Sequence, residues 1–392
     1  PRDRWDYTAT QQITLADLPL GEDGASRRVV MQAPKNGFFY VLDAADGELI
    51  SATPFTAQNW TTGQFDENGR PELVEEAVDL ALYAVVPGPT GAHNWHPMAF
   101  NPDTGLVYIP VNEIPFFYDK TRNVEDSKSF WNIGYDAAAG WPVEYPAGTL
   151  DAVRDLDGGS LLAWDPVKAE PRWAVPFPLP LNGGVLSTQA GLVFQGNKFG
   201  EFVAYDAETG ERLWADKLVG NAAAAPMTYE IDGEQYLSVL SGWGSVSSLI
   251  AGFTYGEAKS KEPARVITFK LGGDGDMPAA LVDNVVRTPQ SPMFGEPDQH
   301  QLGMQRYAES CHFCHGAFAV GGGVVPDLRW SALAGNEQAW DLVVREGALE
   351  KQGMVSFAGR LSKEDTDAIR AYVVQQAWLA VANGDALPPQ DG

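Results

Sequence analysis

The chain has 392 residues, of which 44% are hydrophobic and 20% charged, as in globular proteins that bury a sizeable core. At roughly 100–200 residues per domain, this length predicts two domains or three. The 27 basic and 52 acidic residues give a net charge of −25, which argues strongly against sequence-independent binding to nucleic acid, because that binding needs basic patches. No stretch approaches the roughly 20 continuous apolar residues of a membrane helix, which argues against an integral membrane protein.

Residues 1–275 have the texture of β-structure. Short runs of apolar and aromatic residues alternate with Gly, Asp-Gly and Pro turns, and the 41 Gly and 12 Trp suit short strands better than helical bundles. The predicted strands are Val29–Gln32, Phe38–Leu42, Val107–Val111, Leu192–Gln195, Phe202–Tyr205, Tyr236–Leu240 and Val266–Lys270.

A weak internal repeat runs through this β part. Its best copy extends from Ala204 to Trp214, and the segment from Ala163 to Trp173 has the same spacing 41 residues earlier. In each copy an Asp opens a tight turn, and we expect the Trp to pack against the neighbouring unit. About four copies are recognisable, and a repeat of about 40–60 residues fits one blade of a β-propeller. A set of unrelated hairpins is the alternative.

Residues 276–298 are rich in Pro, Gly, Asp, Ser and Gln and are predicted to be a linker. Residues 299–392 then show helical spacing and form the second predicted domain. The expected helices are Gln301–Cys311, Gln338–Glu346 and Ser362–Val381, the last with Ser362 and Asp365 as an acidic form of the Ser/Thr N-cap pattern.

The strongest local motif is Cys311-His312-Phe313-Cys314-His315, which has the Cys-x-x-Cys-His pattern of c-type haem attachment. Two thiols add across the haem vinyl groups, and the following His ligates the iron. A thioredoxin-like pair would follow the strand of a βαβ unit, and a zinc site would need two further ligands. Neither context is visible, and both cysteines of the chain lie in this motif.

The sixth iron ligand should be Met or His. Downstream of the motif there is no His and one Met, Met354, which lies 39 residues after His315. This arrangement resembles a class I cytochrome c domain, in which such a Met completes the coordination of the iron. Ligation by His315 and Met354 implies electron transfer at a fairly high potential rather than oxygen chemistry.

Three short motifs of the β part gain meaning beside this haem motif. They are Trp-Asp-Tyr at 5–7, Pro-Lys-Asn-Gly at 34–37 and Gly-Ala-His-Asn-Trp-His-Pro at 91–97. Their order and the single-haem tail resemble the soluble (type II) quinohaemoprotein alcohol dehydrogenases, which depend on pyrroloquinoline quinone (PQQ). The resemblance covers essentially the whole chain. It implies an eight-bladed propeller with PQQ and calcium at its axis, followed by a cytochrome c domain.

The resemblance also implies roles for individual residues. Asp6 matches the catalytic base that lies beside the calcium, and Lys35 matches the basic residue at the quinone oxygens. Asn94 and Trp95 match residues that line the cofactor, and Trp243 in Gly-Trp-Gly looks like an aromatic near the tricarboxylate side of PQQ. On this interpretation calcium polarises the quinone carbonyl, Lys35 stabilises charge on the quinone oxygens, and Asp6 removes the hydroxyl proton.

Calcium is favoured over a lanthanide because Thr8 occupies the position where lanthanide-dependent relatives carry a second Asp. The implied function is oxidation of primary or secondary alcohols to aldehydes or ketones, with electrons relayed singly through haem c to a soluble acceptor such as a cytochrome c or a cupredoxin. Covalent haem attachment implies the bacterial periplasm. Two alternatives remain: a related enzyme for a polymeric, cyclic or sugar alcohol, and a non-catalytic propeller–cytochrome module for electron transfer.

The sequence also departs from the family pattern. Members of the family carry a calcium-binding Glu and Asn, a vicinal Cys-Cys disulfide and several cofactor contacts before the Trp-Asp motif, which here begins at Trp5. With about four repeats instead of eight, the chain resembles a C-terminal fragment that lacks the N-terminal half of the propeller. We therefore expect these 392 residues alone to be inactive as an alcohol dehydrogenase.

Overall fold

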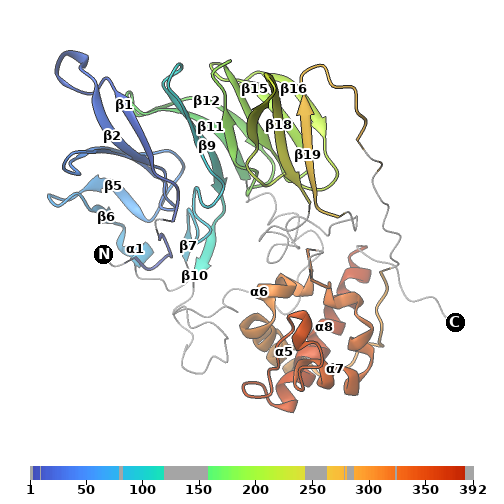
Figure 1. Ribbon diagram of the computed structural model, residues 1–392. Coiled ribbons are helices and arrows are strands. Elements are labelled where there is room, and N and C mark those ends of the chain that lie inside the picture. The colour runs from blue at the N-terminus through green and yellow to red at the C-terminus, as the bar shows by residue number, and fades with distance from the viewer. Residues whose placement is uncertain are drawn as a thin grey trace. The chain divides into compact units, whose positions relative to one another are not determined.

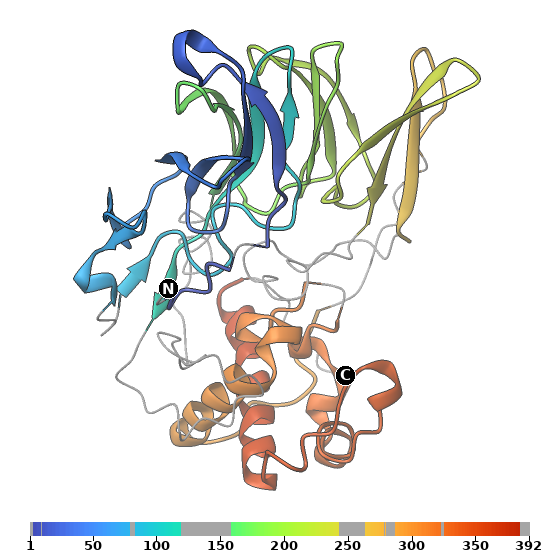
Figure 2. The ribbon, with the colours of Figure 1, turned by 60° about the vertical axis from the view of Figure 1, so that its left-hand side comes forward.

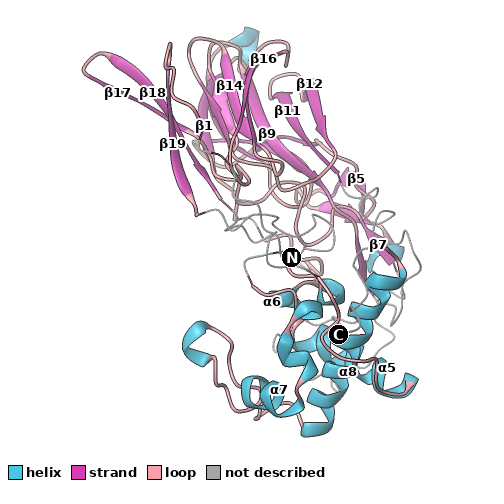
Figure 3. Cartoon of the chain, turned by 90° about the vertical axis from the view of Figure 1, so that its right-hand side faces the viewer, coloured by secondary structure: helices cyan, strands magenta, loops and turns pink. Residues whose placement is uncertain are grey.

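The computed structural model describes residues 3–8, 10–78, 83–118, 158–242, 263–277, 279, 287–322 and 325–384 (Figure 1). These residues divide into a β unit, within 1–117, 154–243 and 262–281, and a second unit that is helical over 287–384. All seven predicted strands and all three predicted helices form, with ends shifted by a few residues at most. Figure 3 shows the strands gathered in one unit and the longer helices in the other.

The β unit contains three four-stranded antiparallel sheets and one three-stranded sheet in the described residues. The first sheet has the order β1 (Thr14–Leu18), β2 (Arg27–Gln32), β3 (Phe38–Asp43), β4 (Leu49–Pro54). The second has the order β8 (Ala99–Asn101), β9 (Leu106–Glu113), β11 (Gly158–Asp165), β12 (Glu170–Phe177). The third is β13 (Val185–Ser187), β14 (Leu192–Gly196), β15 (Glu201–Asp206), β16 (Arg212–Lys217), and the fourth is β17 (Met227–Ile231), β18 (Glu234–Ser241), β19 (Arg265–Lys270).

Two small two-stranded sheets complete the described strands. They pair β5 (Thr61–Phe65) with β6 (Pro71–Leu73), and β7 (Tyr83–Val85) with β10 (Phe116–Tyr118). A short helix, α1 (Glu75–Val78), and a 3-10 turn at Glu22–Gly24 lie in the same unit.

The large sheets pack face to face because their central strands are apolar on both sides. Along β11, Leu162 and Trp164 pack with the first sheet, whereas Leu161 and Ala163 pack with the third sheet. This period of two is the alternation expected for a strand that is buried on both faces. Figure 2 shows the resulting row of sheets, which is the arrangement of propeller blades.

The repeat Trp packs on the next blade, as its spacing predicts. The ring of Trp173 lies 5.6 Å from that of Tyr108 in a tilted arrangement, and its Nε1 donates to the carbonyl of Ala207 at 3.1 Å. Gly210 lies directly under that ring with φ of +75°, and an added Cβ there would come within 2.7 Å of the indole. The Asp-x-x-x-Gly turn that ends at Gly210 therefore provides the surface against which the Trp173 ring packs.

The helical unit is built on two long helices. α5 (Pro297–Ser310) packs against α8 (Lys363–Ala382) at Gly303, where an added Cβ would lie 2.1 Å from the carbonyl of Ala368. The remaining elements are α6 (His312–His315), α7 (Glu337–Val344) and 3-10 turns at Ala317–Ala319, Leu328–Trp330, Ala332–Gly335 and Glu350–Gln352. Within the described part of the chain, none of the helices combines the length and the apolarity needed to cross a membrane.

The first residue before α8 caps it as the sequence predicts. The Ser362 hydroxyl accepts from the backbone N–H of Asp365, and the Asp365 carboxylate accepts from the backbone N–H of Ser362 at 2.8 Å. The chain before α5 also contacts α8, since Trp378 donates to the carbonyl of Ser291 at 2.9 Å and Arg370 lies over the ring of Phe294. Residues 291–296 are thus part of the packing of the helical unit.

Candidate functional site

Asp6 lies in a tight turn that its neighbours hold in place. The Asp3 carboxylate accepts from the backbone N–H of Trp5 at 2.9 Å and of Tyr7 at 2.7 Å. Asp6 lies between these two anchored amides with φ of +60°, a left-handed conformation that Asp tolerates better than most residues. The turn leaves the Asp6 side chain 65% exposed.

The Asp6 carboxylate meets two polar side chains. Lys35 Nζ donates to Asp6 Oδ2 and to the Asp6 main-chain oxygen, both at 3.0 Å, and Thr8 Oγ1 donates to Asp6 Oδ1 at 2.8 Å. The Lys35 side chain is only 8% exposed, so its charge lies beneath an exposed carboxylate. The structure therefore brings together two residues that the sequence places 29 positions apart.

A cluster of aromatic rings packs at this turn. Trp5 is buried, and its ring lies 5.6 Å from that of Tyr7 and 5.4 Å from that of Trp60. Trp60 in turn donates to the carbonyl of Asn36, next to Lys35, at 3.1 Å. The Tyr7 hydroxyl donates to the carbonyl of Pro87. The 5–7 motif and the 34–37 motif are thus joined through one aromatic cluster.

The third motif lies against the Lys35 segment. The backbone N–H of Ala92 donates to the Lys35 carbonyl at 2.9 Å. Gly91 adopts φ of +82°, and an added Cβ would come within 2.4 Å of Lys35 Cγ. A glycine is needed here both for the backbone conformation and for the close approach of Lys35.

Asn94 and Trp95 follow this contact with opposite exposure. Asn94 is buried, donates to the carbonyl of Thr90 at 2.9 Å, and accepts from Gln11 Nε2 at 3.4 Å. Gln11 Oε1 is buried and makes no hydrogen bond within the part of the chain that the structure describes. Trp95 is 60% exposed, so a large aromatic face lies beside buried amide groups. Trp243, the other predicted cofactor contact, lies outside the described residues.

His93 and His96 also belong to the 91–97 motif, and the structure buries the first completely and the second in part. His93 is fully buried, and burial lowers its pKa. Burial, with smaller effects from the charge of Lys198 and from His93, lowers the pKa of His96 to about 4. Lys198 is itself buried, and burial lowers its pKa to about 7. Their place in this motif is the sequence signal that could have pointed to both histidines.

The described residues contain no group of three or more His, Cys, Asp or Glu side chains that could hold a metal ion. Asp6 contributes carboxylate oxygens of the kind that calcium prefers, and Thr8 adds a hydroxyl oxygen close to them. The calcium contact of Asp6 therefore stays a prediction.

In the helical unit, Cys311 lies between α5 and α6, and Cys314 lies within α6. Cys311 ends α5 and precedes α6, and it is buried, whereas Cys314 is exposed. Burial raises the pKa of the Cys311 thiol to about 12. His315 ends α6 and is mostly buried, with its Nδ1 2.9 Å from the carbonyl of Pro326.

The Pro326 carbonyl can accept a hydrogen bond but cannot donate one, so it selects the tautomer of His315 that carries the proton on Nδ1. That tautomer leaves the Nε2 lone pair available to a metal. Burial lowers the pKa of His315, although its contact with Pro326 and the charge of Asp327 oppose this effect. The turn after Pro326 is fixed by a buried ion pair, in which Arg329 donates to Asp327 at 2.6 Å.

The loop that carries Met354 is tied to α7. Phe357 N–H donates to the carbonyl of Val344 at 2.9 Å, and the Ser356 hydroxyl donates to the carbonyl of Arg345. Met354 N–H donates to the carbonyl of Leu349 at 3.1 Å, and the side chain packs partly into the core that contains Cys311.

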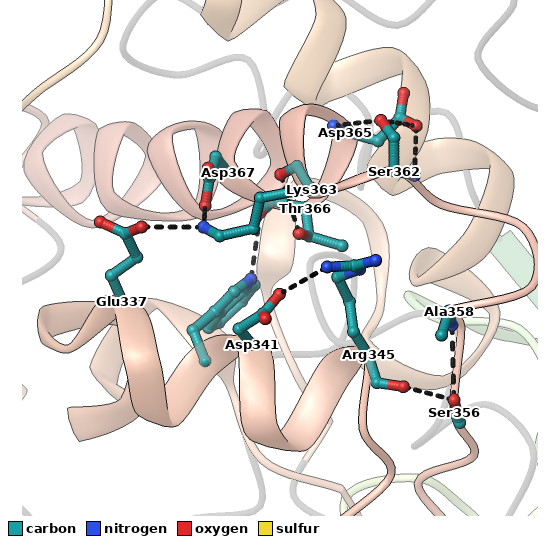
Figure 4. A network of polar contacts seen from close by, with 11 residues as sticks. Glu337, Asp341, Arg345, Ser356, Ala358, Ser362, Lys363, Asp365, Thr366 and Asp367 are labelled. Carbon is teal, nitrogen blue, oxygen red and sulfur yellow. Dashed lines mark hydrogen bonds and ion pairs between the residues drawn. The ribbon is translucent and has the colours of Figure 1, made fainter.

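Figure 4 shows how α7 is fastened to α8. Lys363 reaches Glu337 at 2.9 Å and also pairs with Asp367. The Trp340 indole donates to the Thr366 carbonyl at 3.0 Å. The loop that carries Met354 is therefore attached to α7, and α7 is in turn held to α8.

Comparison with known proteins matches both units. Residues 138–237 match the model for the β-propeller domain of glucose, ethanol and alcohol dehydrogenases (PQQ). Residues 298–373 match the model for subunit III of cbb3-type cytochrome c oxidase. Together with the blade-like sheets and the Cys-x-x-Cys-His helix junction, these matches define a quinoprotein propeller segment joined to a cytochrome c domain.

Individual relatives match nearly the whole chain. Quinohaemoprotein alcohol dehydrogenase ADH IIB of Pseudomonas putida is 43% identical over 96% of this chain and 53% of its own length. The structure of ADH-IIG from Pseudomonas putida HK5 aligns with a TM-score of 0.87 and 38% identity, over 97% of this chain and 56% of that one. The Comamonas testosteroni enzyme aligns with a TM-score of 0.80 and 36% identity, over 96% and 54%.

The chain is therefore a homologue of the quinohaemoprotein alcohol dehydrogenases, and it spans about half the length of the curated relatives it matches. This relationship confirms the recognition made from the three short motifs and the haem tail. It also confirms the predicted fold class, which combines propeller sheets with an all-helical cytochrome c domain.

Proposed function

We propose that the protein oxidises primary or secondary alcohols to aldehydes or ketones, with PQQ, calcium and haem c as cofactors. The observation that carries this proposal is the Asp6 carboxylate, exposed on one side and held on the other by the buried ammonium of Lys35 at 3.0 Å. Similarity to proteins whose names include quinohaemoprotein alcohol dehydrogenase supports the choice of reaction.

Residues of the second and third motifs fit an anionic, planar quinone. Lys35 supplies a cation, Trp95 an exposed aromatic face, and Asn94 a buried amide. Gln11 Oε1, a buried acceptor without a hydrogen bond, lies on the side chain that donates to Asn94 and could accept a donor from a bound molecule. We include Trp243 in this set on the resemblance alone.

Each side chain then has a distinct task. When bound, PQQ with calcium supplies the hydride acceptor and the Lewis acid, and haem c supplies a one-electron relay. Asp6 accepts the proton of the substrate hydroxyl at a carboxylate oxygen, because that carboxylate is open to solvent. Lys35 fixes the orientation of Asp6 and supplies positive charge for oxygens that become negative.

The haem chemistry rests on four side chains of the helical unit. Cys311 Sγ and Cys314 Sγ would attach haem covalently, His315 Nε2 would bind the iron on one side, and Met354 Sδ would bind it on the other. The Nδ1 contact of His315 with Pro326 fits this assignment, since it leaves Nε2 free. An electron acceptor such as a soluble cytochrome c or a cupredoxin would complete the relay, and the compartment would be the bacterial periplasm.

The catalytic part of the proposal is tested in the protein that carries this chain, reconstituted with PQQ and calcium. Alcohol-dependent dye reduction should fall by about 10²–10⁴-fold in Asp6→Asn, the range for loss of a general base. Asp232→Asn is the matched control, because Asp232 is an exposed Asp with φ of +54° in a distant hairpin. Equal rates in Asp6→Asn and the native protein would favour the non-catalytic propeller–cytochrome module.

The haem part is tested by spectroscopy on the same protein. Met354→Ala should retain covalent haem, lose the sulfur-to-iron absorption band and lower the reduction potential by on the order of 0.1 V, within the ≈ 0.8 V range that axial ligands span. Met293→Ala is the control, since Met293 is 53% exposed and precedes α5. An unchanged absorption band in Met354→Ala would rule out this ligand.

A further inference from the structure

His93 bridges two main-chain carbonyls inside the β unit. Its Nδ1 lies 2.7 Å from the carbonyl oxygen of Ala33, and its Nε2 lies 2.7 Å from the carbonyl oxygen of His96. The ring is completely buried. Among the described residues, the ring does not hydrogen-bond to Asp6 or to Lys35, so its role in the site is not explained by direct contact with them.

The two carbonyls belong to the segments that carry the proposed cofactor contacts. Ala33 lies two residues before Lys35 in a loop between β2 and β3, and His96 follows directly after Asn94 and Trp95. The first contact spans 60 residues of sequence. The His93 ring therefore joins the segment that presents the cation to the segment that presents the amide and the indole.

The surrounding contacts make this bridge specific. The Lys35 carbonyl accepts from Ala92 N–H at 2.9 Å, one residue before His93. Gly91 packs so closely on Lys35 that no side chain would fit. Two residues of the other segment, Gly91 and Ala92, thus meet Lys35 itself, and the His93 side chain meets the same loop two residues earlier, at the Ala33 carbonyl.

The chemistry of imidazole explains why histidine suits this position. Both contacts end on carbonyl oxygens, which only accept hydrogen bonds. A ring protonated on both nitrogens donates to both carbonyls, whereas a neutral ring has one N–H and donates to one of them, and in either form the planar ring sets the spacing between the two segments. An aliphatic side chain of similar volume would fill the space but offer these buried carbonyls no donor, which costs free energy.

We propose that His93 is a positioning residue that fixes Lys35 relative to Asn94 and Trp95. Without the bridge, the 33–37 loop moves away from the 91–97 segment, and the Lys35 ammonium leaves its place beneath Asp6. The bridge itself is independent of the proposed function, but its consequence for PQQ binding rests on that function.

Chemical labelling of Lys35 tests the bridge without any cofactor. The Lys35 ammonium is protected, with a side chain that is 8% exposed, whereas Lys168 is 56% exposed and serves as an internal reference. Under native conditions, His93→Leu should raise the acetylation rate of Lys35, measured by peptide mass spectrometry, by about tenfold relative to Lys168. His93→Gln retains an N–H donor and should restore part of the protection.

His300 offers a matched control. It is also buried, and its Nε2 lies 2.8 Å from the carbonyl of Phe294 in the helical unit. His300→Leu should leave Lys35 labelling unchanged. Hydrogen exchange in β15 reports general loosening of the β unit, so a rise in Lys35 labelling that merely follows faster exchange in β15 would overturn the proposal.

A titration with PQQ and calcium separates this inference from the proposed function. If native protein binds PQQ, His93→Leu should weaken binding by about tenfold or more, and His93→Gln by less. If native protein does not bind PQQ while Lys35 labelling rises in His93→Leu, the bridge stands and the proposed function fails. If His93→Leu and His93→Gln both fold and Lys35 labelling is unchanged in each, the bridge is rejected. If His93→Leu does not fold, Lys35 labelling in His93→Gln alone tests the bridge.

Discussion

Lys35 Nζ lies 3.0 Å from both the carboxylate Oδ2 and the main-chain oxygen of Asp6, so one ammonium holds the side chain and the backbone of the same residue. The main-chain contact matters because Asp6 adopts φ of +60°, which is unfavourable for most residues. The Lys35 ammonium thus helps to stabilise the turn and also sets the direction of the carboxylate.

We expect Gly91→Ala to disturb this arrangement through Lys35. The new Cβ would lie 2.4 Å from Lys35 Cγ and 2.7 Å from Lys35 Cα, in a backbone conformation with φ of +82°. The free energy of unfolding should fall by about 2–4 kcal/mol, since the clash adds to the cost of about 1 kcal/mol or more for a non-glycine residue there. Urea unfolding followed by tryptophan fluorescence measures this change.

Gly47→Ala separates the clash from the backbone cost. Gly47 has a nearly equal φ of +79°, and an added Cβ would have no neighbour within 4 Å. It should therefore lose only the backbone part, about 1–2 kcal/mol. Equal losses in the two variants would contradict the close approach of Gly91 to Lys35.

Asp3→Ala should loosen the turn around Asp6. The Asp3 carboxylate accepts hydrogen bonds from Trp5 and Tyr7, and a bond to a charged acceptor is worth about 1.5–3 kcal/mol. Hydrogen exchange of these two amides should accelerate by about tenfold or more. Asp46→Ala, which removes a comparable 2.9 Å bond to the backbone of Glu48 in an exposed turn, should leave both amides at their native rates.

Acid should destabilise the β unit through His96. Its pKa of about 4 lies below the ordinary value of 6.5, so the unfolded chain binds the proton first as pH falls. The stability is fully present above pH 6.5 and is lost towards pH 4, by about 2 kcal/mol after allowance for solvent screening. Lys198, with a pKa of about 7, is largely protonated throughout this range.

His96→Gln should flatten this dependence, since glutamine does not titrate. The measurement is the free energy of unfolding in urea at several pH values between 4 and 7. Burial also lowers the pKa of His93, so a slope of the same sign should remain in His96→Gln. A variant whose slope equals that of the native protein would show that His96 is not the titrating group.

Ser362→Ala should weaken the start of α8 by about 1–2 kcal/mol, because it removes one half of a reciprocal cap. Far-UV circular dichroism during urea unfolding reports the loss. Ser331 provides the comparison: its hydroxyl accepts from Leu333 N–H at 3.3 Å at the start of a four-residue 3-10 turn, and Ser331→Ala should cost less. A larger loss at Ser331 would contradict the importance of the α8 cap.

Local sequence patterns predicted the elements that are defined by residues close together in the sequence. Alternation of apolar residues located β9 and β15, the Asp-x-x-x-Gly turn located the surface against which Trp173 packs, and Ser362 with Asp365 located the start of α8. The two small sheets were missed because β6 and β7 have only three residues each, too few to show a period.

The polar contacts of the site were beyond such patterns. The sequence gives no sign that Lys35 lies under Asp6 or that His93 bridges carbonyls 60 residues apart, because these contacts depend on how blades and loops come together. Taken alone, Lys35 reads as a solvated loop residue, whereas its side chain is 8% exposed. The resemblance to a family identified Lys35, and the structure supplied the environment that the resemblance did not describe.

The contact between His315 and Pro326 has a consequence for how this chain can change. The acceptor is a main-chain oxygen, so exchanging the side chain at position 326 does not delete it. A carboxylate in the same place could be lost by a single substitution, and the basicity of the imidazole would shift with it. Substitutions at position 326 therefore leave the tautomer of His315 unchanged. Changes in the electronic properties of the proposed haem site have to come from substitutions at other positions.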